Sequence, residues 1–525
     1  MMTLNLLSIF FLLPIVLLLI VNLPTKWFST FRNTFGVVQS AIYLSLIGSG
    51  VALFWVSTQQ AAEISFFSVR NLGLSIRIDS LSTIMYTMIS IIGFVVVRFS
   101  KNYLDGENRI RQFFSRLAFT LAFVQLLVIS GNLATLFVAW VGTSIGLHQL
   151  LRFYPNRKKA VLAARKKFIV ARLADLTLLG AFSFIYFEFG SGSLSYLFEQ
   201  LQLISSENIP VTLEIATLLL VFSAALKSVQ LPFHGWLLDV MEAPTPVSAL
   251  LHAGLLNAGP FLIIRFAFLM DLSVVASTTL IAIGAISALF GAIAATTQPS
   301  IKTALAYSSI GHMGFTLMVS GLGVYSASLL HLVAHSFYKA HAFLSSGSII
   351  DRVQTKFAAN FVRSGSPIRM ILGSLSAIAL FGLFAYFWGI NPETEIQLLA
   401  IAGVIFLGIV TVQVNALDAN INLKSVLLLL LGSGLVINAF FLLEQLTHTA
   451  IDSQIPVIRE ASGSLLAMIF IVLSLFLLTV GLQLYAVRFR NNRFAKNIGI
   501  HFKNGLYFNV LFDRMVHALV IKTER

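Results

Sequence analysis

Residues 224–265 read AALKSVQLPFHGWLLDVMEAPTPVSALLHAGLLNAGPFLIIR, and this stretch decides how the chain folds. Its apolar runs carry ionisable side chains, among them Lys227 and His252. An ionisable group in hydrocarbon is costly unless it is paired or hydrated, so such residues usually mark an ion or proton path. Pro232 follows five positions after Lys227. Because proline lacks a backbone donor, it breaks the helix beside the lysine, which is tolerated at membrane depth where the freed backbone lines a cavity.

The composition places the whole chain in a membrane. Of its 525 residues 57% are hydrophobic and 11% are charged, and the mean hydropathy is +0.89. Soluble domains carry about 25% charged residues, so a soluble protein is excluded. The chain has no cysteine, which excludes disulfides, thiolate zinc sites and iron–sulfur ligation on this chain.

The hydropathy pattern predicts an all-α, multi-pass membrane protein with about fifteen transmembrane helices, since a spanning helix needs about 20 mostly apolar residues. The expected spans are 4–22, 36–57, 80–99, 115–130, 132–151, 168–187, 211–231, 246–269, 274–296, 303–322, 324–349, 370–389, 397–416, 425–443 and 463–486. Lys and Arg concentrate in alternate connecting segments, which by the positive-inside rule places the N-terminus outside and the C-terminus in the cytoplasm. The net charge of +14 therefore describes a cytoplasmic face, and we expect lipid rather than nucleic acid as a partner.

The span 324–349 contains HLVAHSFYKAHAF, in which His331, His335 and Lys339 recur every four residues. Residues with this spacing share one face of a helix, about 6 Å apart along its axis. A zinc site is disfavoured, because no third ligand is evident and the lysine would repel a dication. A proton wire fits better, since a neutral imidazole can both donate and accept a hydrogen bond. Structural polar groups packed between helices remain the alternative.

A second set of charges lies at the start of the span 168–187. The basic run RKK at 165–167 is expected at the inner interface, where long side chains extend toward water. Arg172 and Asp175 are three residues apart, a spacing suited to an intrahelical ion pair. This pair either serves packing alone or lets Asp175 adjust a neighbouring lysine, and its position in the sequence does not decide between the two.

Several polar residues near the broken helix are weaker candidates. Glu242 lies in the turn MEAPTPVSAL, where it either gates entry from the cytoplasm near Lys227 and His234 or only caps the next helix. Lys302 begins the span 303–322 and is expected to support the path from the interface. His312, in the same span, is expected to be structural.

Three motifs carry a family resemblance. KSVQLPFHGWLLDVMEAPTPVSALLHAGLL, IKTALAYSSIGHMGF and HLVAHSFYKAHAFLSSGSII resemble segments of the large antiporter-like subunits of respiratory complex I and of multisubunit cation/proton antiporters. The resemblance implies two inverted repeats, each with a broken helix, and a proton path through buried lysines, histidines and acids. Residues at matching positions are Lys227, His252, His331, His335 and Lys339, with Asp175 in an acidic partner's role.

The implied organisation has five parts. They are N-terminal transmembrane helices (1–110), a first repeat (111–270), a second, degenerate repeat (271–420), C-terminal transmembrane helices (421–487) and a basic amphipathic tail (488–525). The tail is expected to lie at the inner membrane surface, as an anchor or as a docking site for a cytoplasmic partner, and both remain open.

Two departures from this family are evident. The family usually has a glutamate directly after the tryptophan of its fifth helix, and LFVAWVGTSIG has Val141 in that place. The second broken helix usually has a lysine followed by an acid, and the corresponding ALFGLFAYFWGI has neither. A chain of this length also leaves no room for the long lateral helix of the complex I subunit.

The segment GLHQLLRFYPNRKKAVLAARKKFIVARLAD narrows the resemblance to the DabB family, the membrane subunits of two-component inorganic-carbon accumulation complexes. This resemblance implies a DabA-like cytoplasmic zinc partner that hydrates CO2. The present chain would supply a path for protons, or less favourably for sodium, in a bacterial inner membrane, without a cofactor or enzymatic activity of its own. The alternatives are a subunit of a cation/proton antiporter or complex I-like pump, and a structural anchor with a vestigial channel.

Overall fold

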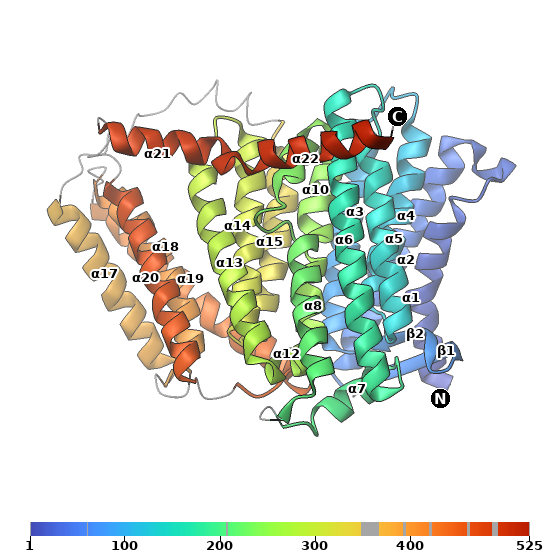
Figure 1. The fold of residues 1–525 in the computed structure, drawn as a ribbon, viewed down its shortest axis with the longest axis horizontal. Helices are drawn as coiled ribbons and strands as arrows, with labels where there is room; N and C mark the ends of the chain where they lie inside the picture. The colour runs from blue at the N-terminus through green and yellow to red at the C-terminus, as the bar shows by residue number, and fades with distance from the viewer. Residues whose placement is uncertain are drawn as a thin grey trace.

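The computed structural model describes residues 2–59, 61–205, 208–347, 367–391, 395–418, 423–458, 462–485 and 492–523. Most of the helices run alongside one another in a wide bundle (Figure 1). Every predicted span coincides with a helix or, for 246–269, with a series of helical segments. Within the described residues, nine helices are long and apolar enough to cross a membrane. The prediction of a multi-pass helical protein is therefore confirmed.

The main body consists of the helices up to residue 345. They are α1 (Met2–Ile20), α2 (Phe31–Val56), α3 (Ser80–Tyr103), α4 (Ile110–Val128), α5 (Leu133–Leu151), α6 (Lys158–Phe189), α7 (Leu194–Leu201), α8 (Val211–Lys227), α9 (Gly235–Asp239), α10 (Thr245–Leu250), α11 (Ala258–Arg265), α12 (Ala267–Leu272), α13 (Val274–Thr296), α14 (Ile301–Gly321) and α15 (Tyr325–Ser345). One large apolar core extends through these helices.

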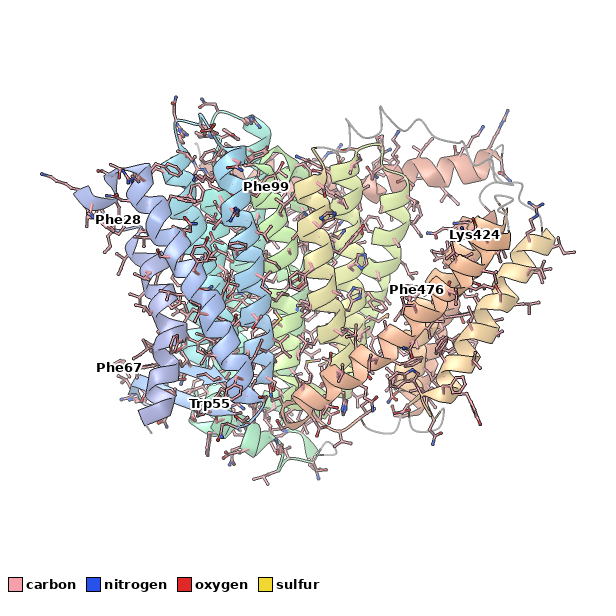
Figure 2. All side chains as sticks on the ribbon, turned by 180° about the vertical axis from the view of Figure 1, so that it is seen from behind. Phe28, Trp55, Phe67, Phe99, Lys424 and Phe476 are labelled. Atoms are coloured by element: carbon pink, nitrogen blue, oxygen red, sulfur yellow. The ribbon has the colours of Figure 1, made fainter. Side chains whose placement is uncertain are left out.

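Four later helices form a second group, inclined to the main body (Figure 2). They are α17 (Pro367–Phe387), α18 (Ile396–Asp418), α19 (Leu423–Ile451) and α20 (Gly463–Tyr485). α17 packs against α18 and α19, whereas α19 meets α15 and α20 meets α13. The expected place of a second broken helix falls on α17, which is continuous. The expectation of a break in both repeats is therefore wrong for the second, because neither proline nor an intramembrane charge interrupts ALFGLFAYFWGI.

The first expected break is confirmed. α8 ends at Lys227, and α9 begins at Gly235. Between them Val229 has a φ of 62°, and the peptide bond before Pro232 is cis. The following span is also interrupted, because a π-helical turn at Leu251–Leu255 separates α10 from α11. Such turns are frequent at functional sites.

A β-hairpin, which the all-α prediction lacks, precedes α3. Strands β1 (Ala62–Val69) and β2 (Leu72–Ile78) pair antiparallel. Arg70 and Asn71 form the turn with φ values of 50° and 62°, as in the two-residue turns that match strand twist. The hairpin lies at the end of the bundle that holds α7, here called the hairpin end, and the C-terminal helices lie at the opposite end (Figure 1).

The tail forms two helices, α21 (Arg493–Lys503) and α22 (Phe508–Thr523), which lie across the end of the bundle (Figure 1). These two helices have 11 and 16 residues, and neither is the long lateral helix that a chain of this length is expected to lack. α22 also explains why one residue that was expected at the membrane interface is buried. Lys166, expected at the interface, is fully buried because its Nζ is paired with Asp239 at 2.5 Å and with Asp513 of α22. The amphipathic tail therefore packs on the protein itself.

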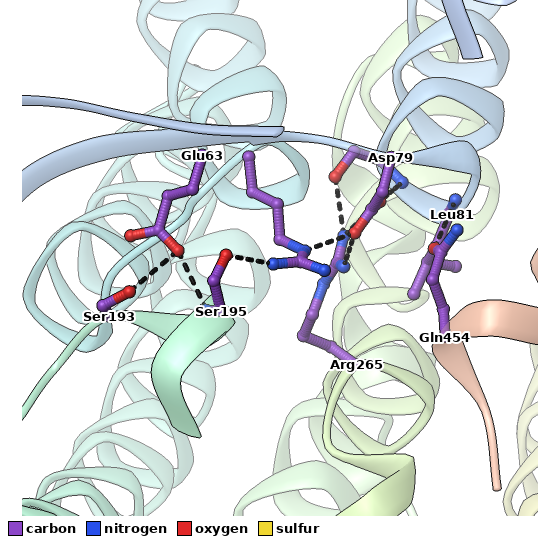
Figure 3. A network of polar contacts seen from close by, with 9 residues as sticks. Glu63, Asp79, Leu81, Ser193, Ser195, Arg265 and Gln454 are labelled. Carbon is purple, nitrogen blue, oxygen red and sulfur yellow. Dashed lines mark hydrogen bonds and ion pairs between the residues drawn. The ribbon is translucent and has the colours of Figure 1, made fainter. Parts of the chain in front are cut away.

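A buried charge network joins the hairpin to the bundle (Figure 3). The carboxylate of Asp79 accepts from Arg77 Nε at 2.7 Å and from Arg265 Nη1 at 2.5 Å, and it also caps α3 by accepting from the Ser82 backbone N–H. Arg77 further donates to Ser195 of α7. Burial alone would raise the pKa of Asp79, but the Arg265 and Arg77 guanidinium groups outweigh burial and hold this pKa well below its usual range.

We expect Asp79→Ala to lower the free energy of unfolding by about 3–5 kcal/mol, because it leaves two buried guanidinium groups unpaired. Since the folded pKa of Asp79 lies below the unfolded value of about 3.9, its contribution is fully present above that pH and is lost as the pH falls further. Thermal unfolding of the detergent-solubilised protein at several pH values measures both effects. Asp105→Ala, at an exposed carboxylate just beyond α3, is the matched control. It should change neither the free energy of unfolding nor its dependence on pH.

Candidate functional site

Lys227 occupies the end of α8, where the helix breaks. Its Nζ donates to the Trp140 carbonyl at 3.0 Å, to Thr143 Oγ1 at 3.0 Å and to Ser144 Oγ at 2.9 Å. The ammonium also lies 4.3 Å from the Trp140 ring centroid. All of these partners belong to α5 and all are neutral. The group that replaces the expected glutamate is therefore not another acid but a set of neutral acceptors within one turn of Val141.

The acidic partner proposed for Lys227 is close but is engaged elsewhere. Asp175 Oδ2 lies 2.6 Å from Arg172 Nη2, which confirms the expected intrahelical pair. Asp175 also interacts electrostatically with Lys227.

Sequence reasoning missed a second lysine in this place. Lys167 was expected at the interface, yet it is only 5% exposed and its Nζ donates to the Ser144 carbonyl at 2.5 Å. Lys167 and Lys227 therefore bind the backbone and the side chain of the same serine. Together with Arg172 and Asp175 they form the Lys227 group. The signal that could have revealed Lys167 is the helical periodicity of α6, which turns this side chain toward α5.

A second collection of basic residues, the imidazole group, lies between α14 and α15. His331, His335 and Lys339 share one face of α15, as their spacing predicted. His312 was expected to be structural, but its Nδ1 lies 3.1 Å from His331 Nε2, and its ring centroid lies 5.1 Å from that of His335. His335 is buried with no hydrogen-bond partner for either ring nitrogen within the described residues.

His252 joins the imidazole group from the π-helical turn. Its Nδ1 lies 2.9 Å from Ser309 Oγ, and Ser309 in turn donates to the Leu305 carbonyl. The same carbonyl accepts from Lys339 Nζ at 3.0 Å. Because the serine hydroxyl proton is used on Leu305, His252 must donate from Nδ1, which leaves its Nε2 as an acceptor. Nε2 has no hydrogen-bond partner in the described part of the chain.

Two small cavities lie along the π-helical turn, and among the described residues none of the imidazole group lines either of them. The larger, about 20 Å³, is lined by Lys227, Lys167, Ser144 and residues of the turn, and the smaller, about 10 Å³, by Thr143, Gly254 and apolar side chains. A cavity needs roughly 10–15 Å³ to hold one water molecule. The polar wall of the larger cavity offers enough partners for such a water. The larger cavity therefore has room for one water molecule, and the smaller is at the limit for one.

The remaining predicted site residues lie at the opposite end from the hairpin. His234 lies beyond the break, with its ring packed against Phe290 at 5.1 Å and near Phe508 of α22. Lys302 donates to Thr245 Oγ1 at 3.2 Å, at the start of α10. Both roles stay predictions. The side chain of Glu242 lies outside the described residues. Across the described segments, no group of three or more His, Asp or Glu side chains is arranged to hold a metal ion.

Comparison with known families supports the resemblance of the motifs. Residues 130–389 match the transmembrane family described as NADH:quinone oxidoreductase/Mrp antiporter, and residues 66–114 match the complex I chain 5 N-terminus. In solved structures, the Mrp complex from Dietzia sp. DQ12-45-1b is similar in fold, with a TM-score of 0.66 at 22% identity over 99% of this chain and 60% of that one. An archaeal membrane-bound sulfane sulfur reductase gives 0.59 at 18% identity over 96% of this chain and 99% of that one.

Curated relatives are more specific. The chain is 40% identical to a probable inorganic carbon transporter subunit DabB from Hydrogenovibrio crunogenus, over 61% of its own length and 62% of the relative's. It is 34% identical to DabB1 from Halothiobacillus neapolitanus, over 72% of its own length and 70% of the relative's. An NADH-quinone oxidoreductase subunit L from Rickettsia typhi is 34% identical over 60% of this chain and 49% of the relative. The chain therefore belongs to the DabB family of inorganic carbon transporter subunits, within the membrane subunits related to complex I and the Mrp antiporters.

Proposed function

We propose that this chain is the proton-conducting subunit of an energy-coupled inorganic carbon pump in a bacterial inner membrane. A DabA-like zinc protein on the cytoplasmic side would hydrate CO2 to bicarbonate, and proton movement through this chain would drive that reaction in one direction. One charge moving through 100 mV contributes about 2.3 kcal/mol. Since about 1.4 kcal/mol is a factor of ten, one proton per turnover biases the hydration by between one and two powers of ten.

The observation that supports this proposal best is the way both central lysines are held. Within the described residues, the hydrogen bonds that Lys227 and Lys339 donate go to carbonyl and hydroxyl oxygens. A carboxylate partner would be left as an uncompensated buried charge if its lysine lost a proton. Neutral acceptors carry no such penalty, so each lysine can alternate between ammonium and amine. A lysine with a purely structural role would not need to change its protonation state.

The proposed route begins at the broken helix and ends between α14 and α15. A proton leaving Lys227 first enters water in the adjoining cavity and must then cross to Nε2 of His252, which does not line that cavity. Protonation there lets Nδ1 pass its proton to the Ser309 hydroxyl, and that hydroxyl gives up its own proton by turning from the Leu305 carbonyl to the neutral amine of Lys339, the other donor to this carbonyl. His335, with both ring nitrogens available, then connects Lys339 to the His312–His331 pair. Each imidazole relays by accepting on one nitrogen and donating from the other.

Lys227→Ala and Lys339→Ala are each expected to lower proton flux by about 10²-fold or more, because each removes a group that must bind the proton in transit. Flux is measured in proteoliposomes that contain the chain with its co-purified partner and a pH-sensitive dye. Growth at air-level CO2 of a host that depends on the complex should be lost in parallel. Lys26→Ala, at an exposed lysine, is the control and should retain flux. Normal growth and flux in both variants, with the complex intact, would leave the anchor as the function.

The coupling ion is tested separately in cells. Because imidazole and amine groups bind protons but not sodium ions, a protonophore should abolish bicarbonate accumulation. Dissipating only the sodium gradient, with a sodium ionophore at clamped membrane potential, should leave accumulation unchanged. Intracellular inorganic carbon is measured by isotope uptake. The opposite pattern would assign the path to sodium.

The partner is tested by co-purification. An affinity-tagged chain expressed with its neighbouring genes should bring down a soluble protein that contains zinc, measured by elemental analysis of the purified complex. Recovery of the other subunits of a cation/proton antiporter instead would favour that function over the carbon pump.

A further inference from the structure

The His312–His331 pair lines a cavity of about 360 Å³ whose wall includes Ile405 of α18 and Phe476 of α20. The lysine and acid that the family usually has in this second group of helices are nevertheless missing. An ionisable residue that the sequence reasoning overlooked lies on α19. Glu444 precedes the end of that helix by seven residues, about 10 Å along the axis at 1.5 Å per residue. α19 runs from Lys424, at the end that holds α21, toward the hairpin end (Figure 2). Glu444 thus lies within the candidate membrane span Lys424–Gln454 of the structure, one residue past the span 425–443 predicted from the sequence and on the hairpin side of the helix centre.

Glu444 faces protein rather than lipid. It is 8% exposed, and its Oε1 accepts from Ser326 Oγ, in the first turn of α15, at 2.6 Å. The charged groups that interact with it among the described residues are His448, one turn along α19, and Glu395, just before α18. His448 is itself 3.9 Å from Asp452. Glu444 is therefore a buried membrane carboxylate whose direct partner is neutral, and such a residue is costly unless it binds a proton or cation.

Polar side chains connect the imidazole group to this end of α15. Ser320 and Ser328 share a hydrogen bond of 2.7 Å, and Ser328 also donates to the Thr316 carbonyl at 3.1 Å. Ser328 precedes His331 by three residues, so it lies one helical turn, about 4.5 Å, closer to the hairpin end. The seam between α14 and α15 therefore stays polar from the imidazoles to Ser328. Ser326, two residues earlier, faces α19 instead, where it meets Glu444.

A cavity opens beside the end of this seam. It has a volume of about 370 Å³ and is lined by Gly321, Tyr325, Gln397 and Asp271, among others. Gly321 and Tyr325 are the chain neighbours of Ser320 and Ser326. A water molecule occupies about 30 Å³ of the liquid, so this cavity has room for several. Glu444 does not itself line the cavity, but its partner Ser326 is the chain neighbour of Tyr325, which does, so Ser326 is the link between the carboxylate and this water.

We propose that Glu444 is the proton-binding carboxylate at the hairpin-side end of the path. Glu444 replaces the lysine and acid that are missing from α17. It belongs to α19, which packs against α15. The carboxylate accepts one proton from the His312–His331 pair through the Ser320/Ser328 hydroxyls and bound water, and releases it to water in the cavity. No bond other than those to the proton is formed or broken. This inference rests on the proposed proton-conducting function.

The experiment compares Glu444→Gln, Glu444→Asp and the control Glu199→Gln in the proteoliposome flux assay on the intact complex. Glutamine keeps the shape and the hydrogen bond from Ser326 but cannot exchange a proton, so flux should fall by about tenfold or more. Aspartate keeps the carboxylate and should restore part of the flux. Glu199 is an exposed carboxylate of α7 at the same end, and its replacement should leave flux unchanged.

A spectroscopic readout separates relay from structure. In infrared difference spectra between high and low pH, the carboxylic acid C=O band of the protonated Glu444 side chain should be present in the wild type and absent in Glu444→Gln. Wild-type flux in Glu444→Gln, together with loss of flux in Lys227→Ala, would overturn the role of Glu444 and leave the proton path intact. Wild-type flux in both variants would instead overturn the path itself. Loss of flux in Glu444→Asp as well as Glu444→Gln, with no change in the infrared band, would assign Glu444 a purely structural role.

Discussion

An ammonium buried in a protein must be hydrogen-bonded, and the rest of this structure depends on how that requirement is met for Lys227. A carboxylate would satisfy the charge but would also fix it, because separating a buried ion pair costs several kcal/mol. Two hydroxyls and a carbonyl from α5 satisfy the donors without adding an opposing charge. The lysine is thus bound in position but is not committed to one protonation state, which is the condition for a relay.

The fold supplies these acceptors through two interruptions in its helices. The break after α8 leaves Lys227 at a helix end, and the adjoining Ser228 donates to the carbonyl of Leu256, just beyond the π-helical turn. Gly259 is required at this contact, since a Cβ there would lie 2.0 Å from Ser228 Oγ and 2.4 Å from the Ala224 carbonyl. The end of α8 and the start of α11 are therefore packed backbone to backbone beside the two interruptions. Leu251 and Leu255 of the π-helical turn also line the cavity next to Lys227.

Much of this arrangement could be predicted from local patterns in the sequence. Hydropathy located the spans, Pro232 located the break, and a spacing of four placed His331, His335 and Lys339 on one face, because each of these depends on local geometry alone. What the sequence could not provide is which helices face one another. His312 and Lys167 were judged structural or interfacial because their neighbours in space come from other helices, and Glu444 was overlooked because its partner Ser326 is more than a hundred residues away. The hairpin was missed because short strands between spans have no hydropathy signal of their own.

The Lys227 group contains more basic than acidic side chains, and this excess couples the charge states of its two lysines. Lys167 and Lys227 both bind Ser144, one through its carbonyl and one through its hydroxyl, while Asp175 is the one acid of the Lys227 group and is paired with Arg172. Lys167 interacts electrostatically with Lys227, and two like charges repel more strongly in a poorly solvated site than in water. Charging one lysine therefore favours the loss of a proton from the other. A glutamate at Val141 would have damped this repulsion. Under the proposed function, its absence leaves a pair of lysines in which the arrival of one proton promotes the departure of another.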